Sequence, residues 1–432
     1  MVHQRAPRAG APGLPGRRRR QQALALHLRM RERQRSVAQR SNQPFIDEEL
    51  QTFTNINRTG HRAAQQPWPV EAPWLCGRCA LHSTIEAGTI LYLMIEHRLE
   101  ITDLDRRIWE EELADFLPEQ LYDAHVHVYD PTHCTSTTDD EPTEGVTWWE
   151  RPVHLMDRTA LDACYDTLYP GRRLNYLMMG WVYRRGDWDA ANEFTAAQTA
   201  DDPRSVAFML TPAAFDARHV AETVDRLGFR GLKPYRWWAD DENECRITDM
   251  LPEPLIEVAN DRDLVVMMHL GKSRAIADEE NLADLERLTR QYPRVKWILA
   301  HLARCLVAWP LEEAAPRLRD IPNIWFDFSS VTSTDVFMAA LRNFPHDRIM
   351  YGSDFPVDLM KGQYIGWGKA WAHLTEDMIK QMGITHCDPR PTFIGYEMLR
   401  GARRAMLNLD LDRSTVEDIF YHNAVRLLGI NH

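Results

Sequence analysis

Eight short apolar segments recur between residues 122 and 354, and they constrain the fold more than any other feature of the sequence. Most successive segments begin about 25 to 35 residues apart, which is the length of one strand-and-helix unit. They are apolar on both faces, as parallel strands are when helices cover both sides of a sheet. The segments are 122–128, 174–182, 205–210, 229–234, 263–269, 295–301, 323–328 and 348–354.

Eight such units predict an α/β protein built as a (β/α)8 TIM barrel. An open doubly wound sheet is the competing fold, but it would more naturally contain about five or six strands. Stretches of sequence with helical periodicity separate the apolar segments. It predicts helices over 102–119, 217–227, 281–292 and 415–428, the last with Ser414 as its N-cap.

Three connections are long for loops that follow a barrel strand, namely 131–173, 235–250 and 357–413. All three leave the carboxyl ends of strands, and this face of a barrel carries the active site. We therefore expect long loop insertions that form a rim or lid. Two of them contain the tryptophans Trp148, Trp149, Trp367 and Trp371. These rings are candidates for a hydrophobic clasp or for the contacts of a homodimer.

The N-terminal stretch differs in charge from the rest of the chain. Residues 1–93 contain 14 Arg, no Lys and 6 acidic residues, a net charge of +8, whereas the remainder carries −20. The first 65 residues or so lack a sustained apolar period, which is typical of disorder. A transit peptide, a nucleic-acid-binding arm and sequence upstream of a true start at Met94 are the open alternatives. We assign 1–93 to a disordered or non-native extension and 94–432 to the TIM-barrel domain.

The composition of the chain also bears on its partners and its compartment. The acidic body argues against nucleic acid as the main partner. No window approaches the roughly 18 apolar residues of a membrane span. The seven cysteines are scattered and odd in number, which argues against a secreted disulfide framework and for a reducing interior. We expect a cytoplasmic protein that acts on a small-molecule substrate.

Polar side chains stand where several of the apolar segments end. His125 and His127 lie one residue apart in the first segment, so both imidazoles project from the same side of a strand and can hold one divalent metal ion. A lone histidine at such a place is more often a satisfied core residue. The fourth, fifth, sixth and eighth segments end in Lys233, His269, His301 and Asp354. Convergence of these groups at one end of a barrel predicts a metal-dependent site.

On these residues the chain resembles the amidohydrolase superfamily, and specifically the amidohydrolase-related (type 2) family. That family includes hydrolases, lactonases and decarboxylases such as aminocarboxymuconate semialdehyde decarboxylase. The resemblance covers about residues 120–430 and includes the segment 419–428, which is similar to the family's final helix. It implies that His125, His127 and His269 are metal ligands. It also implies that His301 is a catalytic histidine and that Asp354 is both a ligand and a proton carrier.

Three imidazoles and one carboxylate suit Zn²⁺, with Mn²⁺, Fe²⁺ or Co²⁺ as alternatives. Such a site predicts a metal-dependent hydrolase that acts on a small amide, lactone or ester through activated water. The alternative is a metal-dependent, non-oxidative decarboxylase of an aromatic or unsaturated acid. A non-catalytic barrel used for binding or scaffolding is the third hypothesis.

Three residues beyond the ligand set are candidates for substrate binding. Lys233 is one, although it could instead be carbamylated and bridge two metals, or be structural. Arg304 follows His301 by three residues and could pair with an anionic substrate or be an ordinary solvated arginine. Trp237 could stack on a planar substrate or pack within a lid. Asp327 ends the seventh segment and either reaches the site or forms hydrogen bonds within the barrel.

Overall fold

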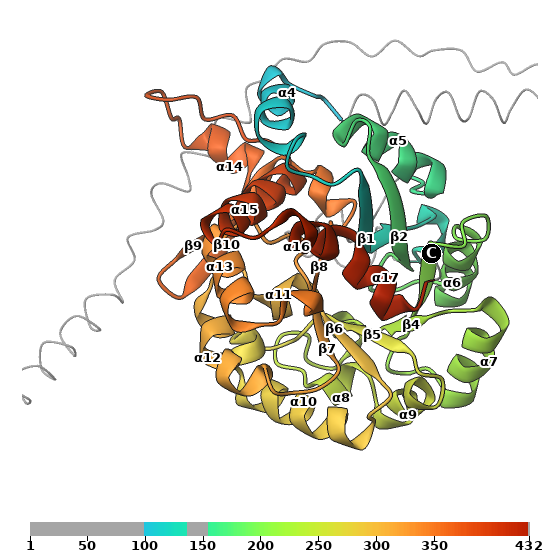
Figure 1. Cartoon of the computed structure of the whole chain (residues 1–432). Helices are drawn as coiled ribbons and strands as arrows, with labels where there is room; N and C mark the ends of the chain where they lie inside the picture. Colours follow the sequence, from blue (N-terminus) through green and yellow to red (C-terminus); the bar gives the residue numbers. More distant parts are fainter. Residues whose placement is uncertain (1–98, 136–153, 431–432) are drawn as a thin grey trace, which may run out of the picture. The chain divides into compact units, whose positions relative to one another are not determined.

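The computed structural model describes residues 99–135 and 154–430, and the predicted extension over 1–93 lies outside these residues. Eight parallel strands follow one another around a sheet in the order of the sequence (Figure 1). They are β1 (Gln120–Val128), β2 (Arg173–Gly180), β3 (Val206–Leu210), β4 (Gly231–Lys233), β5 (Val265–Met268), β6 (Lys296–Leu299), β7 (Ile324–Asp327) and β8 (Ile349–Met350). Each lies in or overlaps one of the eight apolar segments, and the predicted (β/α)8 barrel is confirmed.

The sheet closes through the residues that follow β8 rather than through β8 itself. The backbone N–H of Ala124 donates to the carbonyl oxygen of Tyr351 at 3.0 Å, and that of Asp354 donates to the oxygen of His125 at 2.9 Å. Two residues further along β1, the backbone N–H of His127 donates to the carbonyl oxygen of Phe355 at 2.9 Å. These bonds satisfy the exposed edge of β1. They also bring Asp354 directly beside the two histidines of β1.

Helices cover the outside of the barrel between successive strands (Figure 1). The long ones are α5 (Arg158–Leu168), α6 (Trp188–Ala197), α7 (Ala217–Leu227), α9 (Glu253–Asp261), α10 (Glu279–Gln291), α12 (Trp309–Leu318), α13 (Thr334–Asn343) and α15 (Ile394–Asn408). Helix α7 has the predicted bounds because both ends carry local signals. The carboxylate of Asp216 accepts from the first free N–H groups, and Gly228 ends the helix with a left-handed φ of 71°.

Both terminal helices of the described chain differ from prediction. The predicted helix 102–119 is α4 (Asp103–Ile108), which continues as the π-helical turn η1 (Trp109–Leu113). The predicted helix 415–428 consists of α16 (Arg413–Glu417), the π-helical turn η7 (Asp418–His422) and α17 (Asn423–Leu428). Its N-cap is Asp412, which accepts from the N–H of Thr415, so the assignment of Ser414 was wrong. A carboxylate two residues earlier outcompetes the serine hydroxyl.

The barrel interior and the C-terminal segments η7 and α17 share one apolar cluster. Alternate strand residues such as Leu177, Phe208 and Met267 point inward and are fully buried. The side chains of Tyr421 and Val425 belong to the same cluster, so η7 and α17 cover one end of the barrel. The other face of the strands packs against the surrounding helices in a larger cluster. The barrel is therefore a packed core, and the cavity lined by the candidate site residues lies at the carboxyl ends of the strands.

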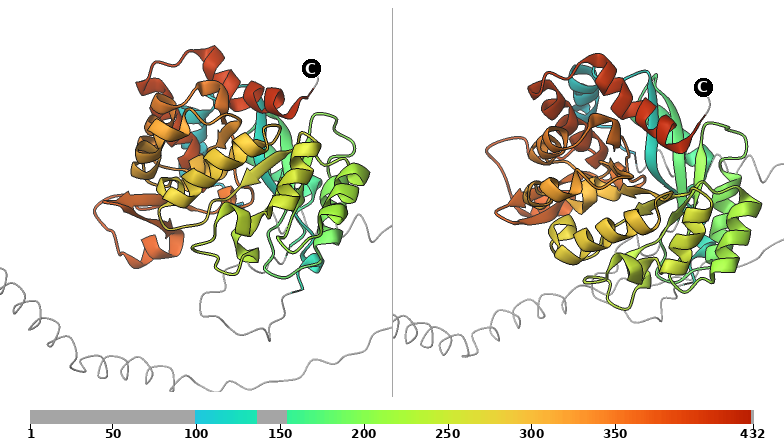
Figure 2. Two further views of the ribbon diagram at one scale, coloured as in Figure 1. Left: turned by 90° about the horizontal axis from the view of Figure 1, so that it is seen from below. Right: turned by 60° about the horizontal axis from the view of Figure 1, so that its bottom comes forward.

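The long insertions are shorter than the sequence suggested, because barrel helices occupy part of them. Helix α5 lies inside the first and α15 inside the third, where α15 packs on α13. The remainder of the third insertion contains a hairpin of β9 (Gly362–Trp367) and β10 (Ala370–Thr375), which projects from the barrel (Figure 2). The short elements are η2 (Pro131–His133), η3 (Arg236–Trp238), α8 (Ile247–Met250), η4 (Ala275–Ala277), α11 (Ala300–Arg304), η5 (His346–Arg348), η6 (Val357–Leu359) and α14 (Glu376–Gln381). Among the described residues, no helix has the length and apolar character to cross a membrane.

Candidate metal centre

The two histidines of β1 lie side by side at the carboxyl end of the barrel. His125 is 1 % exposed and His127 is 3 % exposed, with ring centroids 5.3 Å apart. The intervening Val126 points to the other face and joins the outer core. Strand alternation alone therefore places both imidazoles on one side.

The carboxylate of Asp354 completes a group of three potential ligands. Its Oδ1 lies 3.3 Å from Nε2 of His125 and 3.6 Å from Nε2 of His127. Its Oδ2 accepts a hydrogen bond from the hydroxyl of Ser330 at 2.9 Å. Burial acts to raise the pKa of Asp354, but the neighbouring imidazoles, His125 and His301 first, hold that pKa well below its usual value. The group is a carboxylate at neutral pH.

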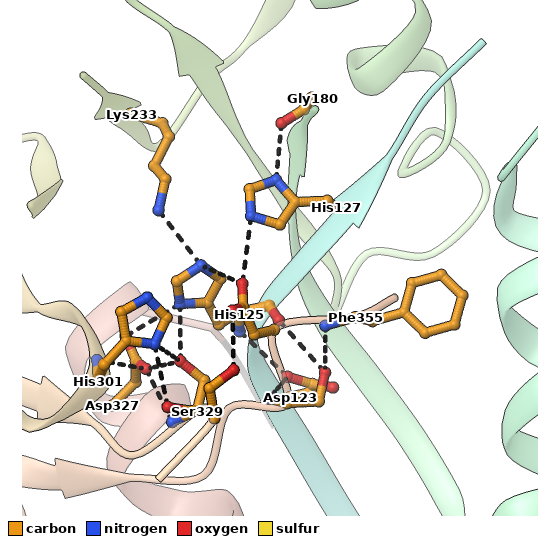
Figure 3. Close-up of polar contacts among 12 residues, drawn as sticks. Asp123, His125, His127, Gly180, Lys233, His301, Asp327, Ser329 and Phe355 are labelled. Atoms are coloured by element: carbon orange, nitrogen blue, oxygen red, sulfur yellow. Dashed lines mark hydrogen bonds and ion pairs between the residues drawn. The ribbon is translucent and has the colours of Figure 1, made fainter. Parts of the chain in front are cut away.

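Hydrogen bonds on the far side of each ring determine which nitrogen faces Asp354 with a lone pair. Nδ1 of His127 lies 2.8 Å from the carbonyl oxygen of Gly180, and Nδ1 of His125 lies 3.2 Å from Oδ2 of Asp327 (Figure 3). Both partners only accept, so each Nδ1 carries the hydrogen and each Nε2 carries the lone pair. Burial also lowers the pKa of His125 to about 4, which keeps this ring neutral at pH 7.

The donor set therefore fits a metal ion. The ligand atoms of His125, His127 and Asp354 lie within 4.8 Å of one another. Two nitrogen lone pairs and a carboxylate oxygen face each other with no hydrogen between them, an arrangement that a divalent cation stabilises. The outer hydrogen bonds from Gly180 and Asp327 are those that orient ligating histidines in metal sites.

The ligand atoms of His125, His301 and Asp327 also lie within 4.8 Å of one another. In this second group Asp327 positions the histidines by hydrogen bonds. Oδ1 of Asp327 accepts from the backbone N–H of His301 at 3.3 Å and from that of Ser329 at 3.1 Å. The hydroxyl of Ser329 also bonds to Asp327, and it lies 2.9 Å from Nδ1 of His301 (Figure 3). Because these hydrogen bonds already use the oxygens of Asp327, it orients the two histidines.

His301 is held by an unusual backbone. Residues 301–304 of α11 form a left-handed turn, with φ values of 58°, 49°, 60° and 60° and no glycine. The N–H of Cys305 closes it by donating to the oxygen of His301 at 3.0 Å. Each non-glycine residue in this region costs about 1–3 kcal/mol, and such strain concentrates at functional sites. The turn directs His301 toward His125, with ring centroids 5.1 Å apart, and directs Arg304 toward the same cavity.

His269 lies beside this group rather than within it. Its ring centroid is 5.1 Å from that of His301 and 5.0 Å from that of Tyr235. No nitrogen of His269 belongs to a group of ligand atoms within 4.8 Å among the described residues. Its Nδ1 is buried and lacks a hydrogen-bond partner in the described part of the chain. The structure thus brings His269 to the wall of the site, and its role as a ligand stays a prediction.

Lys233 is buried next to the first histidine. Its Nζ lies 3.2 Å from Nε2 of His125, and the residue is 1 % exposed (Figure 3). Burial lowers the pKa of Lys233 to about 8, although Asp354 and Asp327 oppose this shift. The pKa of this amine therefore lies close to neutral pH, where a small further shift would remove its charge.

A cavity of about 310 Å³ opens above these groups. The predicted substrate-binding residues Lys233, Arg304 and Trp237 all line it, together with His269, His301 and Asp354. Sequence reasoning missed Ser329 and left the role of Asp327 open. Their spacing of two residues at the end of β7 was an available signal, because alternate residues face the same side of a strand. No comparable signal exists for Trp181 and Tyr364, which also line the cavity.

Solved structures with a similar chain trace include a 5-carboxyvanillate decarboxylase from Sphingomonas paucimobilis, at 14% identity and a TM-score of 0.46, covering 73% of this chain and 100% of that one. A 4-oxalomesaconate hydratase from Rhodopseudomonas palustris is 16% identical, with a TM-score of 0.45 and coverage of 72% and 95%. A dihydroxybenzoic acid decarboxylase from Polaromonas sp. JS666, with bound manganese and 2-nitroresorcinol, is 16% identical, with a TM-score of 0.46 and coverage of 72% and 98%.

The curated proteins contain no match to the chain. The family model described as amidohydrolase matches residues 122–430, which include every barrel strand from β2 onward and most of β1. The match also spans both histidines of β1, His301 and Asp354. The chain therefore belongs to the amidohydrolase family, a family of metal-dependent enzymes.

Proposed function

We propose that the protein is a metal-dependent enzyme that acts on a small carbonyl compound in the cavity above His125. One observation supports this most strongly: the lone pairs of His125 and His127 converge with the carboxylate of Asp354 at the cavity floor. We assign His125, His127, His269 and Asp354 as ligands. Zn²⁺ is the expected ion, with Mn²⁺, Fe²⁺ or Co²⁺ as alternatives.

The bound ion would supply Lewis acidity toward a carbonyl and an activated water. Asp354, besides its proposed role as a ligand, is a carboxylate that can take a proton and pass it on. The Nδ1 of His301 donates to the carbonyl oxygen of Ser329 at 3.0 Å. In the neutral imidazole, Nε2 is then free to accept a proton or hydrogen bond from a substrate. The chain thus offers two proton carriers, one within the ligand group and one beside it.

Hydrolysis of an amide, lactone or ester is our first candidate reaction. It needs one group that takes a proton from water and one that protonates the leaving group, and Asp354 and His301 suit these tasks. Non-oxidative decarboxylation is the second candidate. It is favoured by the positive charge that Lys233, Arg236 and Arg304 bring to the cavity, since a carboxylic acid is its substrate.

Metal content and isotope labelling test the two proposals. Purified protein should contain about one divalent ion per chain, and its removal by a chelator should abolish turnover, with recovery on adding Zn²⁺ or Mn²⁺. In ¹⁸O-water, hydrolysis places the label in the product acyl group, whereas decarboxylation releases CO₂ from the substrate and leaves no labelled acyl group. Turnover that persists after complete metal removal would contradict both candidates.

Two further predictions concern the protein outside its site. We propose a cytoplasmic location, on the scattered cysteines, and a homodimer that uses the hairpin of β9 and β10. Two large apolar side chains are exposed there, Trp367 at 57% and Trp371 at 40%. Light scattering of purified protein at micromolar concentration tests the oligomeric state.

A further inference from the structure

Two arginines from different elements line the cavity that holds the candidate metal centre. Arg236 begins η3, in the loop after β4, and Arg304 ends the left-handed turn after β6. Neither lies within 4.0 Å of a carboxylate among the described residues, whereas Arg246 contacts Asp284 at 2.6 Å and Arg400 contacts Glu112 at 2.9 Å. The two cavity arginines thus differ from Arg246 and Arg400, which are paired with carboxylates.

The protein orients both guanidinium groups without neutralising them. Nη1 of Arg304 donates to the carbonyl oxygens of Lys272 at 2.8 Å and Leu270 at 3.4 Å. Nη1 of Arg236 donates to the carbonyl oxygen of Glu242 at 3.1 Å and to Oδ1 of Asn243 at 3.2 Å. A guanidinium has five N–H donors, so most of the donors on each side chain stay available to a ligand.

The pair is electrostatically unfavourable on its own. The Nε of Arg236 is buried and has no hydrogen-bond partner within the described ranges 99–135 and 154–430. Burial first, and the positive charge of Arg236 second, lower the pKa of Arg304. Two like charges that are partly withdrawn from water without a counterion destabilise the folded chain. An anionic ligand would remove this penalty and satisfy the free N–H groups.

We propose that Arg236 and Arg304 form a subsite for a carboxylate of the substrate that is distinct from the group reacting at the metal centre. This inference rests on the proposed function and names its substrate class, a small planar molecule with a second acidic group. Arginine forks match carboxylates through two parallel hydrogen bonds. The rings of Tyr235 and Trp237, with centroids 5.0 Å apart, lie in the same wall and provide a surface for a planar body.

Binding of three matched probes to the metal-loaded protein tests the subsite without requiring turnover. The probes are isophthalate, benzoate and benzamide, measured by calorimetry at constant ionic strength. Isophthalate should bind at least about tenfold more tightly than benzoate, because only it can occupy the metal centre and the arginines together. Benzamide should bind most weakly.

Substitutions of the two arginines then test whether they cause the preference for isophthalate. Arg304→Gln and Arg236→Gln should each reduce the isophthalate-to-benzoate preference severalfold or more, and Arg304→Lys should reduce it less than Arg304→Gln. The matched control is Arg218→Gln on the exposed face of α7, which should leave the preference unchanged. Cooperative thermal unfolding with a midpoint no lower than that of the parent protein establishes that each variant is folded.

Three outcomes would overturn the inference. They are equal binding of isophthalate and benzoate, a preference that persists in both glutamine variants, and no binding of isophthalate at millimolar concentration. Tighter binding of 3-phosphonobenzoate than of isophthalate would reassign the subsite to phosphorylated substrates and also reject it. Failure of the proposed function is distinguishable, because it would appear as turnover that persists after metal removal, which is measured separately from the probe preference.

Discussion

Asp327 lies beneath His125, with its Oδ2 3.2 Å from Nδ1 of the imidazole, and both side chains are buried. The contact joins the end of β7 to β1, through two residues that are 202 positions apart in the chain. Burial acts to raise the pKa of Asp327, but the imidazole of His125 lowers that pKa to about 2. The carboxylate therefore stays charged and keeps Nε2 of His125 as the nitrogen that faces Asp354.

Replacing this carboxylate should weaken metal binding without removing a ligand. Asp327→Asn keeps the size of the side chain, but its amide can donate to His125 and favour the wrong tautomer. We expect metal affinity to fall about 10- to 100-fold, as for other outer partners of ligating histidines. Competition with a chromophoric chelator measures this affinity. Asp225→Asn on the surface of α7 is the matched control, and equal affinities in the two variants would refute the role of Asp327.

The ligand assignment is tested by deleting imidazoles one at a time. His125→Ala and His269→Ala should each lose bound metal and activity together, because each removes a proposed ligand. His219→Ala on the exposed face of α7 should change neither. Elemental analysis of the purified variants gives the stoichiometry. The result for His269 is the more informative, since its nitrogens lie outside the close group; full metal content there would exclude it as a ligand.

The left-handed turn predicts an unusual response to glycine. Ala303 has a φ of 60° and is fully buried, so Ala303→Gly relieves backbone strain there. The free energy of unfolding should stay the same or rise by up to about 1 kcal/mol. Ala402→Gly in the middle of α15, equally buried but right-handed, should lower it by about 1 kcal/mol. Urea unfolding compares the two; a larger loss for Ala303→Gly would show that the turn is not strained.

A buried carboxyl below the site predicts how stability depends on pH. Asp123 accepts hydrogen bonds from Tyr165 at 2.8 Å and from the N–H of Ser353 at 2.9 Å, and burial raises its pKa from 3.8 to about 6. The folded state therefore binds this proton more tightly than the unfolded state. Its contribution to stability is complete below about pH 4 and is lost as pH rises through 6.

The variant Asp123→Asn removes this titrating group and keeps the size of the side chain, so the two proteins can be compared at each pH. Relative to the variant, metal-free parent protein should be more stable at pH 4 than at pH 7 by as much as about 3 kcal/mol, from a shift of about two pKa units. Urea unfolding at a series of pH values measures the difference. A difference that does not change between pH 4 and pH 7 would contradict the raised pKa.

Local patterns sufficed for much of the architecture. The alternation of side chains along a strand placed His125 and His127 on one side, and the spacing of apolar segments predicted all eight strands, since both depend on neighbours in the chain. The position of Lys233, His301 and Asp354 at one face followed from the rule that parallel barrel strands end together. None of these inferences needed a distance between remote residues.

The remaining features depend on how remote segments meet, and no local pattern encodes that. The support of His125 by Asp327 is set by the geometry of strands β1 and β7 across the barrel. The left-handed turn after His301 contains no glycine, so it carries no sequence signal, and surrounding packing holds it. Arg236 and Arg304 lie far apart in the chain and line one cavity because the loops after β4 and β6 converge. The sequence thus determined the strand-end residues of the site, whereas tertiary packing decided their hydrogen bonds, the backbone strain, the pairing of charges and the residues that complete the cavity.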